Sequence, residues 1–225
     1  MQPLITRFIK SSILTLIFVA LLLLAAGSWN YCQAWLYLAI SLMMNLANIL
    51  ALKDNSELSK ERSKPGKNAE PWDKKILGLG FLLNILIFLF AGLDSGRFHF
   101  TPEFPWQMSL IGVSLNVLGM TIFIRALKEN KFFSAIVRIQ SERNHQVCTT
   151  GPYSLVRHPG YLGMILGTLG FPFLFLSYWS VIPTVLSIIL LLIRTKKEDL
   201  FLAKELAGYK EYQKSTKFLL IPNIW

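Results

Sequence analysis

Six long apolar runs constrain what this chain of 225 residues can fold into. They cover residues 11–26, 31–52, 76–93, 106–127, 161–179 and, more briefly, 181–193. A bilayer core about 30 Å thick requires roughly 20 apolar residues per helix, which most of these runs approach. The runs are continuous and rich in leucine, whereas strands of a membrane barrel alternate in segments of about ten residues. The sequence therefore predicts an all-α integral membrane protein with about six transmembrane helices.

The basic residues indicate how these helices are oriented. The net charge is +10, which by itself could suggest a nucleic-acid partner. If the N-terminus is cytoplasmic and all six runs cross, every one of the 23 basic residues except Arg97 lies on the cytoplasmic side. The charge therefore reports topology, and we expect no nucleic acid. Both termini should be cytoplasmic, in the plasma or inner membrane of a prokaryote or the endoplasmic reticulum of a eukaryote.

The first run also has the features of a cleavable secretory signal. Arg7 and Lys10 precede it, and small residues end it at 25–27. Cleavage would leave the orientation of the remaining helices unchanged.

The chain divides into four N-terminal spans, residues 1–127, and a C-terminal region, residues 128–225. The polar loop 53–75 between the second and third spans is predicted to be a solvated connection without chemistry. Four asparagines inside the spans are expected to bond across helices: Asn45, Asn48, Asn84 and Asn116. No charged residue lies at a span centre, which argues against a pump or coupled transporter.

The last two spans should form a helical hairpin, because only a few residues around Ser177–Ser180 join them. The second helix is expected to continue past Arg194 through KKEDLFLAKELAGYKEY. The hairpin then brings GPYSLVRHPGYLG, residues 151–163, and RTKKED, residues 194–199, to one side of the membrane. This convergence predicts a cytosolic pocket.

The first of these stretches has the features of an anion site. His158 precedes Pro159 at a predicted helix start, where the backbone donors of Gly160 and Tyr161 and the partial positive charge favour an anion. Tyr153 and Tyr161 offer ring faces to a cation or a purine. The alternative is a plain helix start with a snorkelling Arg157.

Arg194 and Glu198, in the second stretch, share one helical face. Together they suit a ligand that bears both a carboxylate and an ammonium group. The alternative is an ordinary charged helix end at the membrane interface, to which we assign Lys196, Lys197 and Asp199.

These residues also carry a family resemblance. HQVCTTGPYSLVRHPGYLG, followed by RTKKED, GYKEY and a closing IP, is similar to the isoprenylcysteine carboxyl methyltransferase family over about residues 130–225. The resemblance implies a membrane methyltransferase that uses S-adenosyl-L-methionine in a cytosolic pocket, with Arg194 and Glu198 as catalytic residues and Arg194 at the substrate. By motif, it implies cofactor contacts at Gln140, His145, Gln146, Val147, Cys148, Tyr153, His158, Pro159, Gly160, Tyr161 and Glu198.

The sequence departs from the family pattern in two places. The family often has two glutamates where this chain has Glu198 and Asp199. It also often has a glycine three residues before the first tail tyrosine, whereas here Gly208 directly precedes Tyr209. Any role for Tyr209 and Tyr212 is therefore open.

The acceptor and two alternative functions also stay open. A small-molecule or lipid-like acceptor could present a carboxylate, which Arg194 would hold, or an amine or thiol, for which Glu198 or His158 is the candidate base. An NADPH-dependent reductase of the sterol or steroid type would need basic residues for a 2′-phosphate, and CTTGPYSLV has none. A non-catalytic scaffold would bind neither cofactor. We expect the lipid bilayer as partner and no metal ion.

Overall fold

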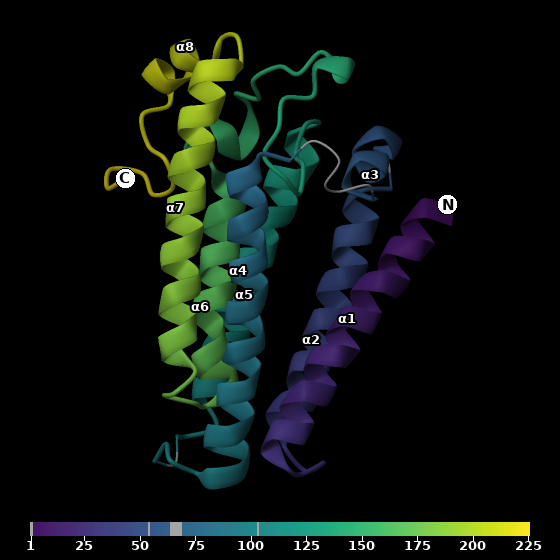
Figure 1. Cartoon of the computed structure of the whole chain (residues 1–225), viewed down its shortest axis with the longest axis vertical. Coiled ribbons are helices and arrows are strands. Elements are labelled where there is room, and N and C mark those ends of the chain that lie inside the picture. The colour runs from purple at the N-terminus through teal and green to yellow at the C-terminus, as the bar shows by residue number, and fades with distance from the viewer. Residues whose placement is uncertain (1, 54, 64–68, 103) are drawn as a thin grey trace.

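The computed structural model is a bundle of helices that runs along one axis (Figure 1). It describes residues 2–53, 55–63, 69–102 and 104–225, and no strand occurs in these ranges. The predicted all-α fold is therefore confirmed. Its α-helices are α1 (Gln2–Ala26), α2 (Cys32–Ala51), α3 (Ser56–Ser63), α4 (Pro71–Ala91), α5 (Met108–Glu129), α6 (Pro159–Phe175), α7 (Val181–Glu205) and α8 (Tyr209–Ser215).

The six predicted spans correspond to α1, α2, α4, α5, α6 and α7. Within the described residues, four segments are long and apolar enough to cross a membrane: Leu4–Ala26, Cys32–Ala51, Pro71–Phe98 and Met108–Glu129. The third includes α4 and the π-helical segment Gly92–Phe98 that follows it. α6 is apolar but has 17 residues, and α7 has 25 residues with charged side chains in its second half.

α5 and α6 pack backbone to backbone through glycines. A Cβ atom at Gly119 would lie 2.4 Å from the carbonyl oxygen of Gly163, and one at Gly163 would lie 2.4 Å from that of Gly119. Only glycine allows this approach, which is a common device where helices associate in membranes. This contact fixes the position of the α6 start relative to the end of α5.

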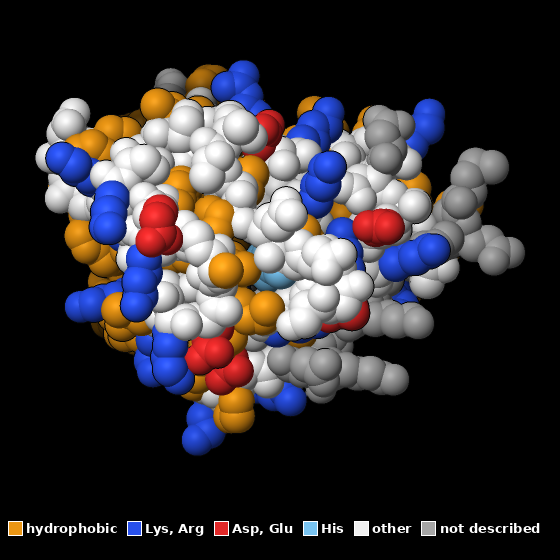
Figure 2. All heavy atoms as spheres, turned by 90° about the horizontal axis from the view of Figure 1, so that it is seen from above, with side chains coloured by type: hydrophobic (Ala, Val, Ile, Leu, Met, Phe, Trp, Pro, Cys, Tyr) orange, Lys and Arg blue, Asp and Glu red, His pale blue; other side chains and the backbone are white. Residues whose placement is uncertain are grey.

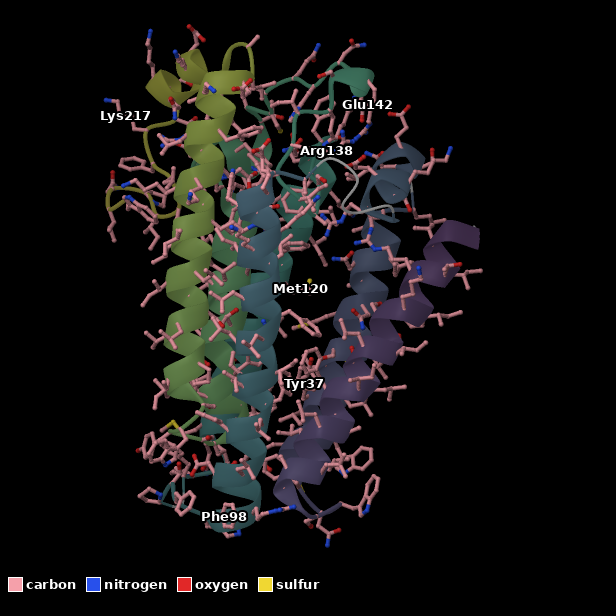
Figure 3. The ribbon with its side chains drawn as sticks, in the orientation of Figure 1. Tyr37, Phe98, Met120, Arg138, Glu142 and Lys217 are labelled. Atoms are coloured by element: carbon pink, nitrogen blue, oxygen red, sulfur yellow. The ribbon has the colours of Figure 1, made fainter. Side chains whose placement is uncertain are left out.

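α1 and α2 lie side by side and lean away from α4, α5, α6 and α7 toward the end of the bundle that carries α3 and α8 (Figure 1). At the opposite half, an aromatic cluster joins the two groups. The ring of Phe88 on α4 lies 4.6 Å from Phe18 of α1, 4.9 Å from Tyr37 of α2 and 5.2 Å from Phe175 of α6, centroid to centroid. Figure 3 shows Tyr37 and Met120 in the space between the two groups.

The predicted hairpin between α6 and α7 is confirmed, and a buried carboxylate holds it. Asp94, in the π-helical segment, accepts hydrogen bonds from the hydroxyl of Ser177 at 2.6 Å and the backbone N–H of Trp179 at 3.2 Å. The same carboxylate accepts the N–H and hydroxyl of Thr101. The side chain of Asp94 thus joins the α6–α7 loop to the segment that contains Thr101, at the end of the bundle opposite α8.

Two expectations need correction. The last helix does not continue through Tyr212, because Gly208 adopts a left-handed conformation, with φ of 81°, that separates α7 from α8. Asn84 and Asn116 do not bond across helices: each donates to the carbonyl one turn earlier in its own helix. Asn45 does bond across, to Thr15 of α1 at 3.2 Å.

Candidate active site

A cavity of about 280 Å³ lies at the end of the bundle that carries α3 and α8. Figure 2 looks down on this end, where Lys and Arg side chains spread around the rim and a histidine lies near the middle. The walls come from α3, α4, α5, α6, α7, α8 and the segments 130–148 and 153–158. Ten of the predicted site residues line it: His145, Gln146, Val147, Cys148, Tyr153, His158, Gly160, Tyr161, Arg194 and Glu198.

The backbone around Arg157 and His158 is held by the C-terminal tail. The N–H of Arg157 donates to the carbonyl of Phe218 at 2.9 Å, and that of His158 donates to Leu219 at 3.0 Å. Pro159 then starts α6, where its fixed φ suits the first turn. The N–H of Tyr161 already donates to the carbonyl of His158 at 3.1 Å, so it is not available to an anion as expected.

Asp199 is the centre of a buried polar network. It accepts hydrogen bonds from Arg157 at 2.8 and 3.1 Å, from Tyr209 at 2.8 Å and from Gln213 at 2.8 Å, and its Oδ1 lies 3.2 Å from Nε2 of His158. Burial disfavours the charge of Asp199, but the bonds from His158 and Arg157 outweigh burial and hold the pKa of the carboxyl well below its usual range. The interpretation of Asp199 as an ordinary exposed charge at a helix end is therefore wrong.

The network also explains the two tail tyrosines. Tyr209 is buried and its hydroxyl lies 3.2 Å from Nε2 of His158. Tyr212 is buried too, and its hydroxyl donates to the carbonyl of Tyr153 at 2.6 Å. Both rings line the cavity. The break at Gly208 turns α8 back toward α7, and this brings the two tyrosines onto the turn that precedes α6.

Glu198 lies one residue before Asp199, but its side chain lines the cavity, which that of Asp199 does not. Its carboxylate accepts a hydrogen bond of 2.5 Å from the hydroxyl of Tyr161, and it lines the cavity half-buried. No described Lys or Arg lies within ion-pair distance of Glu198. The carboxylate is thus an anionic group in the cavity wall that could bind a cationic ligand.

Arg194 was expected to contact the substrate, but its guanidinium already bonds to other residues of the protein. Its Nε and Nη2 donate to the two carboxylate oxygens of Asp73 at 2.7 and 3.1 Å, and Nη2 also donates to the carbonyl of Ala135. Asp73, which is fully buried, accepts the N–H of Val137 as well. The guanidinium also lies over the ring of Tyr161, 5.4 Å from its centroid.

Asp73 was missed because it lies in the first turn of α4, at the end of the loop expected to have no chemistry. An acidic residue there is common for reasons of helix polarity alone, so its position gave no specific signal. That loop takes part in the site: Arg62, within it, and Leu77, just after it, line the cavity. Glu61 holds Arg138, another lining residue, at 2.6 Å.

The segment after α5 wraps the cavity from above. Arg138 bridges Glu61 and Glu142, as Figure 3 shows for the labelled Arg138 and Glu142. His145 lies against the ring of Phe132, with centroids 4.5 Å apart, and its Nδ1 accepts the N–H of Gln140 at 3.4 Å. Burial, with the charges of Arg138 and Arg143, lowers the pKa of His145 to about 4, so it is neutral at pH 7.

Gln140 and Pro159 are the two predicted cofactor contacts that do not line the cavity. Gln140 is fully buried, donates to the carbonyl of Phe132 and accepts from Arg143, so its amide supports the segment that carries His145. Pro159 is buried within the first turn of α6. The described residues contain no cluster of three metal-ligating side chains.

Comparison with known proteins adds an independent observation. Residues 106–204 match the model of the isoprenylcysteine carboxyl methyltransferase (ICMT) family. A probable protein-S-isoprenylcysteine O-methyltransferase of Oryza sativa subsp. indica is 32% identical over 66 residues, which cover 29% of this chain and 35% of that protein. Protein-S-isoprenylcysteine O-methyltransferase A of Arabidopsis thaliana is 29% identical over 102 residues, 43% of this chain and 47% of that protein.

A bacterial protein is also similar. The cobalt-zinc-cadmium resistance protein CzcN of Cupriavidus metallidurans is 32% identical over 135 residues, which cover 59% of this chain and 58% of that protein. The alignments with these three relatives thus span about a third to three fifths of each relative's length. The match to the family model includes both motif stretches, 151–163 and 194–199, and it confirms the resemblance of this part of the chain to the ICMT family.

Proposed function

We propose that this protein is a membrane methyltransferase that transfers a methyl group from S-adenosyl-L-methionine to a small or lipid-anchored acceptor. The observation that carries the proposal is that the turn before α6 and Glu198 of α7 line the same cavity, and both stretches lie in the family match. When bound, this cofactor supplies an electrophilic methyl group on a sulfonium.

The cavity residues suit the two polar ends of such a cofactor. Glu198 would supply a carboxylate for the ammonium group of its amino-acid end, and the hydroxyl of Tyr161 orients that carboxylate at 2.5 Å. The segment from His145 to Cys148 supplies a partly apolar wall for the adenosine, and the neutral ring of His145 adds no competing charge. Residues 140 and 159 would act indirectly, through the backbone that they position.

Arg194 would fix geometry on the acceptor side. Because Asp73 and Ala135 already take its hydrogen bonds, its position is rigid before any ligand arrives. Methyl transfer needs a direct in-line approach, so the protein's task is to position and desolvate the two reactants. Arg194, held by Asp73, lies over the ring of Tyr161, which itself bonds Glu198. These side chains would form one wall of the space in which the two reactants meet.

A lipid-anchored acceptor fits the apolar part of the cavity. Leu77 of α4, Phe123 of α5 and Met164 of α6 line it, and all three helices are apolar over most of their length. The plant relatives are named for O-methylation of isoprenylcysteine, and we extend that substrate class to this chain. The end that carries the cavity would face the cytoplasm, with both termini, in accordance with the distribution of basic residues.

The proposal is tested by calorimetry on detergent-purified protein, titrated separately with S-adenosyl-L-methionine and with NADPH. We expect binding of the first, and transfer of its labelled methyl group to a prenylated cysteine. Binding of NADPH alone would favour a reductase, and binding of neither would favour a scaffold.

A further inference from the structure

Arg62 is an arginine in the cavity wall that comes from outside the region matched by the family model. It lies on α3, and its guanidinium carbon is 5.3 Å from the ring centroid of Phe133 and 5.8 Å from that of Phe123. Its Nη1 donates to the carbonyl of Phe133 at 3.1 Å. Two aromatic faces and one carbonyl thus hold the side chain at the cavity wall.

The charge of Arg62 is not neutralised by the residues around it. Its Nε is buried and has no hydrogen-bond partner, and no described carboxylate lies within ion-pair distance of its guanidinium. The neighbouring Glu61 is taken by Arg138 and Ser134. Burial, and after it the like charge of Arg7, lowers the pKa of Arg62.

The other arginines in the cavity wall differ in this respect. Arg138 faces Glu61 and Glu142, Arg157 faces Asp199, and Arg194 faces Asp73. A half-buried guanidinium without a counter-ion is costly in a protein interior, because no ion pair compensates for the free energy lost on its desolvation. An anion that enters the cavity would offset this cost through charge-assisted hydrogen bonds to the guanidinium, which lines the cavity.

We propose that Arg62 binds the anionic group of the methyl acceptor; this inference rests on the methyltransferase function proposed above. The surroundings of Arg62 select an oxyanion attached to an apolar chain, because Phe123, Phe133 and Leu77 line the cavity with it. The donor's ammonium group would lie at Glu198 of α7, and the anion of the acceptor at Arg62 of α3. Each reactant then has its own charge partner.

Two compounds carry such an oxyanion: a prenylated cysteine with a free carboxylate and a phospholipid with its phosphate. The test is competition binding to the detergent-purified protein with N-acetyl-S-farnesylcysteine, its methyl ester, and phosphatidylethanolamine. The ester matters because it retains the apolar chain and loses the charge. The variants are Arg62→Met, Arg62→Lys and, as matched control, Arg125→Met, which removes an exposed arginine of α5 that does not line the cavity.

We expect Arg62→Met to weaken binding of the anionic acceptor about 10- to 100-fold, the value of one or two charge-assisted hydrogen bonds, while ester binding changes less than about twofold. Arg62→Lys should retain part of the preference for the acid over the ester. Arg125→Met should bind both compounds like the wild type. Whichever anion shows the Arg62-dependent loss, farnesylcysteine or phospholipid, identifies the acceptor class.

Equal losses for acid and ester, or no loss for either anion, would overturn the inference. Calorimetry with S-adenosyl-L-methionine separates the two levels of the argument. If the wild-type protein does not bind it, the methyltransferase proposal fails. If Arg62→Met binds it normally and also binds the acid normally, only the role of Arg62 fails. A circular dichroism spectrum that matches the wild type shows that the variant is folded.

Discussion

Breaking the ion pair between Arg194 and Asp73 should be one of the most destabilising single changes at the site. The side chain of Asp73 is 0% exposed and that of Arg194 is 8% exposed, and two hydrogen bonds of 2.7 and 3.1 Å join them. Asp73→Asn retains an acceptor for Val137 but leaves the guanidinium buried without its counter-charge. Removing one partner of a buried pair costs about 3–5 kcal/mol, and we expect about 3 kcal/mol here because Ala135 still accepts one bond.

A double-mutant cycle distinguishes the pair from general damage. Arg194→Met leaves Asp73 unpaired and should be similarly costly, whereas Asp73→Asn combined with Arg194→Met removes both charges. We expect the double variant to be more stable than the sum of the single effects by about 2 kcal/mol, measured by denaturant unfolding in detergent with circular dichroism. Additivity within about 0.5 kcal/mol would show that the two side chains do not interact, and the proposed rigid wall would be wrong.

Two further predictions concern the rest of the site and the fold. Because the pKa of His145 is lowered from 6.5 to about 4, the unfolded chain binds more protons between these values, so stability should fall as the pH drops from about 6.5 to 4 and be level above that window. His145→Phe should flatten this part of a plot of unfolding midpoint against pH, and an unchanged slope would contradict the assignment. Gly119→Ala should destabilise the α5–α6 contact by about 1–3 kcal/mol through overpacking, whereas Gly167→Ala, where a Cβ meets nothing within 4 Å, should change the unfolding midpoint little; equal effects of the two would contradict the close packing.

The helices were predictable because the apolar runs that form them are local in sequence. Val181 begins both the last predicted run and α7, and the run 106–127 corresponds closely to α5. The break at Gly208 was not predicted, because the run of charged and apolar residues across it keeps a helical pattern. Glycine does not by itself fix where a helix ends, and here its left-handed conformation does so.

The site was predictable where one motif supplies neighbouring residues and less so where distant elements meet. His158, Tyr161 and Glu198 share the cavity as the hairpin topology suggested. The partner of Arg194 is 121 residues away, on a helix whose position next to α7 no local pattern encodes. Asp199 and Glu198 are adjacent and both acidic, so the sequence does not distinguish their roles. The structure shows that Asp199 accepts hydrogen bonds from the tail, whereas Glu198 lies in the cavity wall.

Calorimetry of S-adenosyl-L-methionine binding to Glu198→Gln tests the central claim most directly. The substitution retains the shape of the side chain and an acceptor for Tyr161 but removes the negative charge. We expect affinity to fall about 10- to 100-fold, while Glu205→Gln, an exposed glutamate two turns further along α7, binds like the wild type. Binding by Glu198→Gln equal to that of the wild type would show that the cofactor does not use this cavity as proposed.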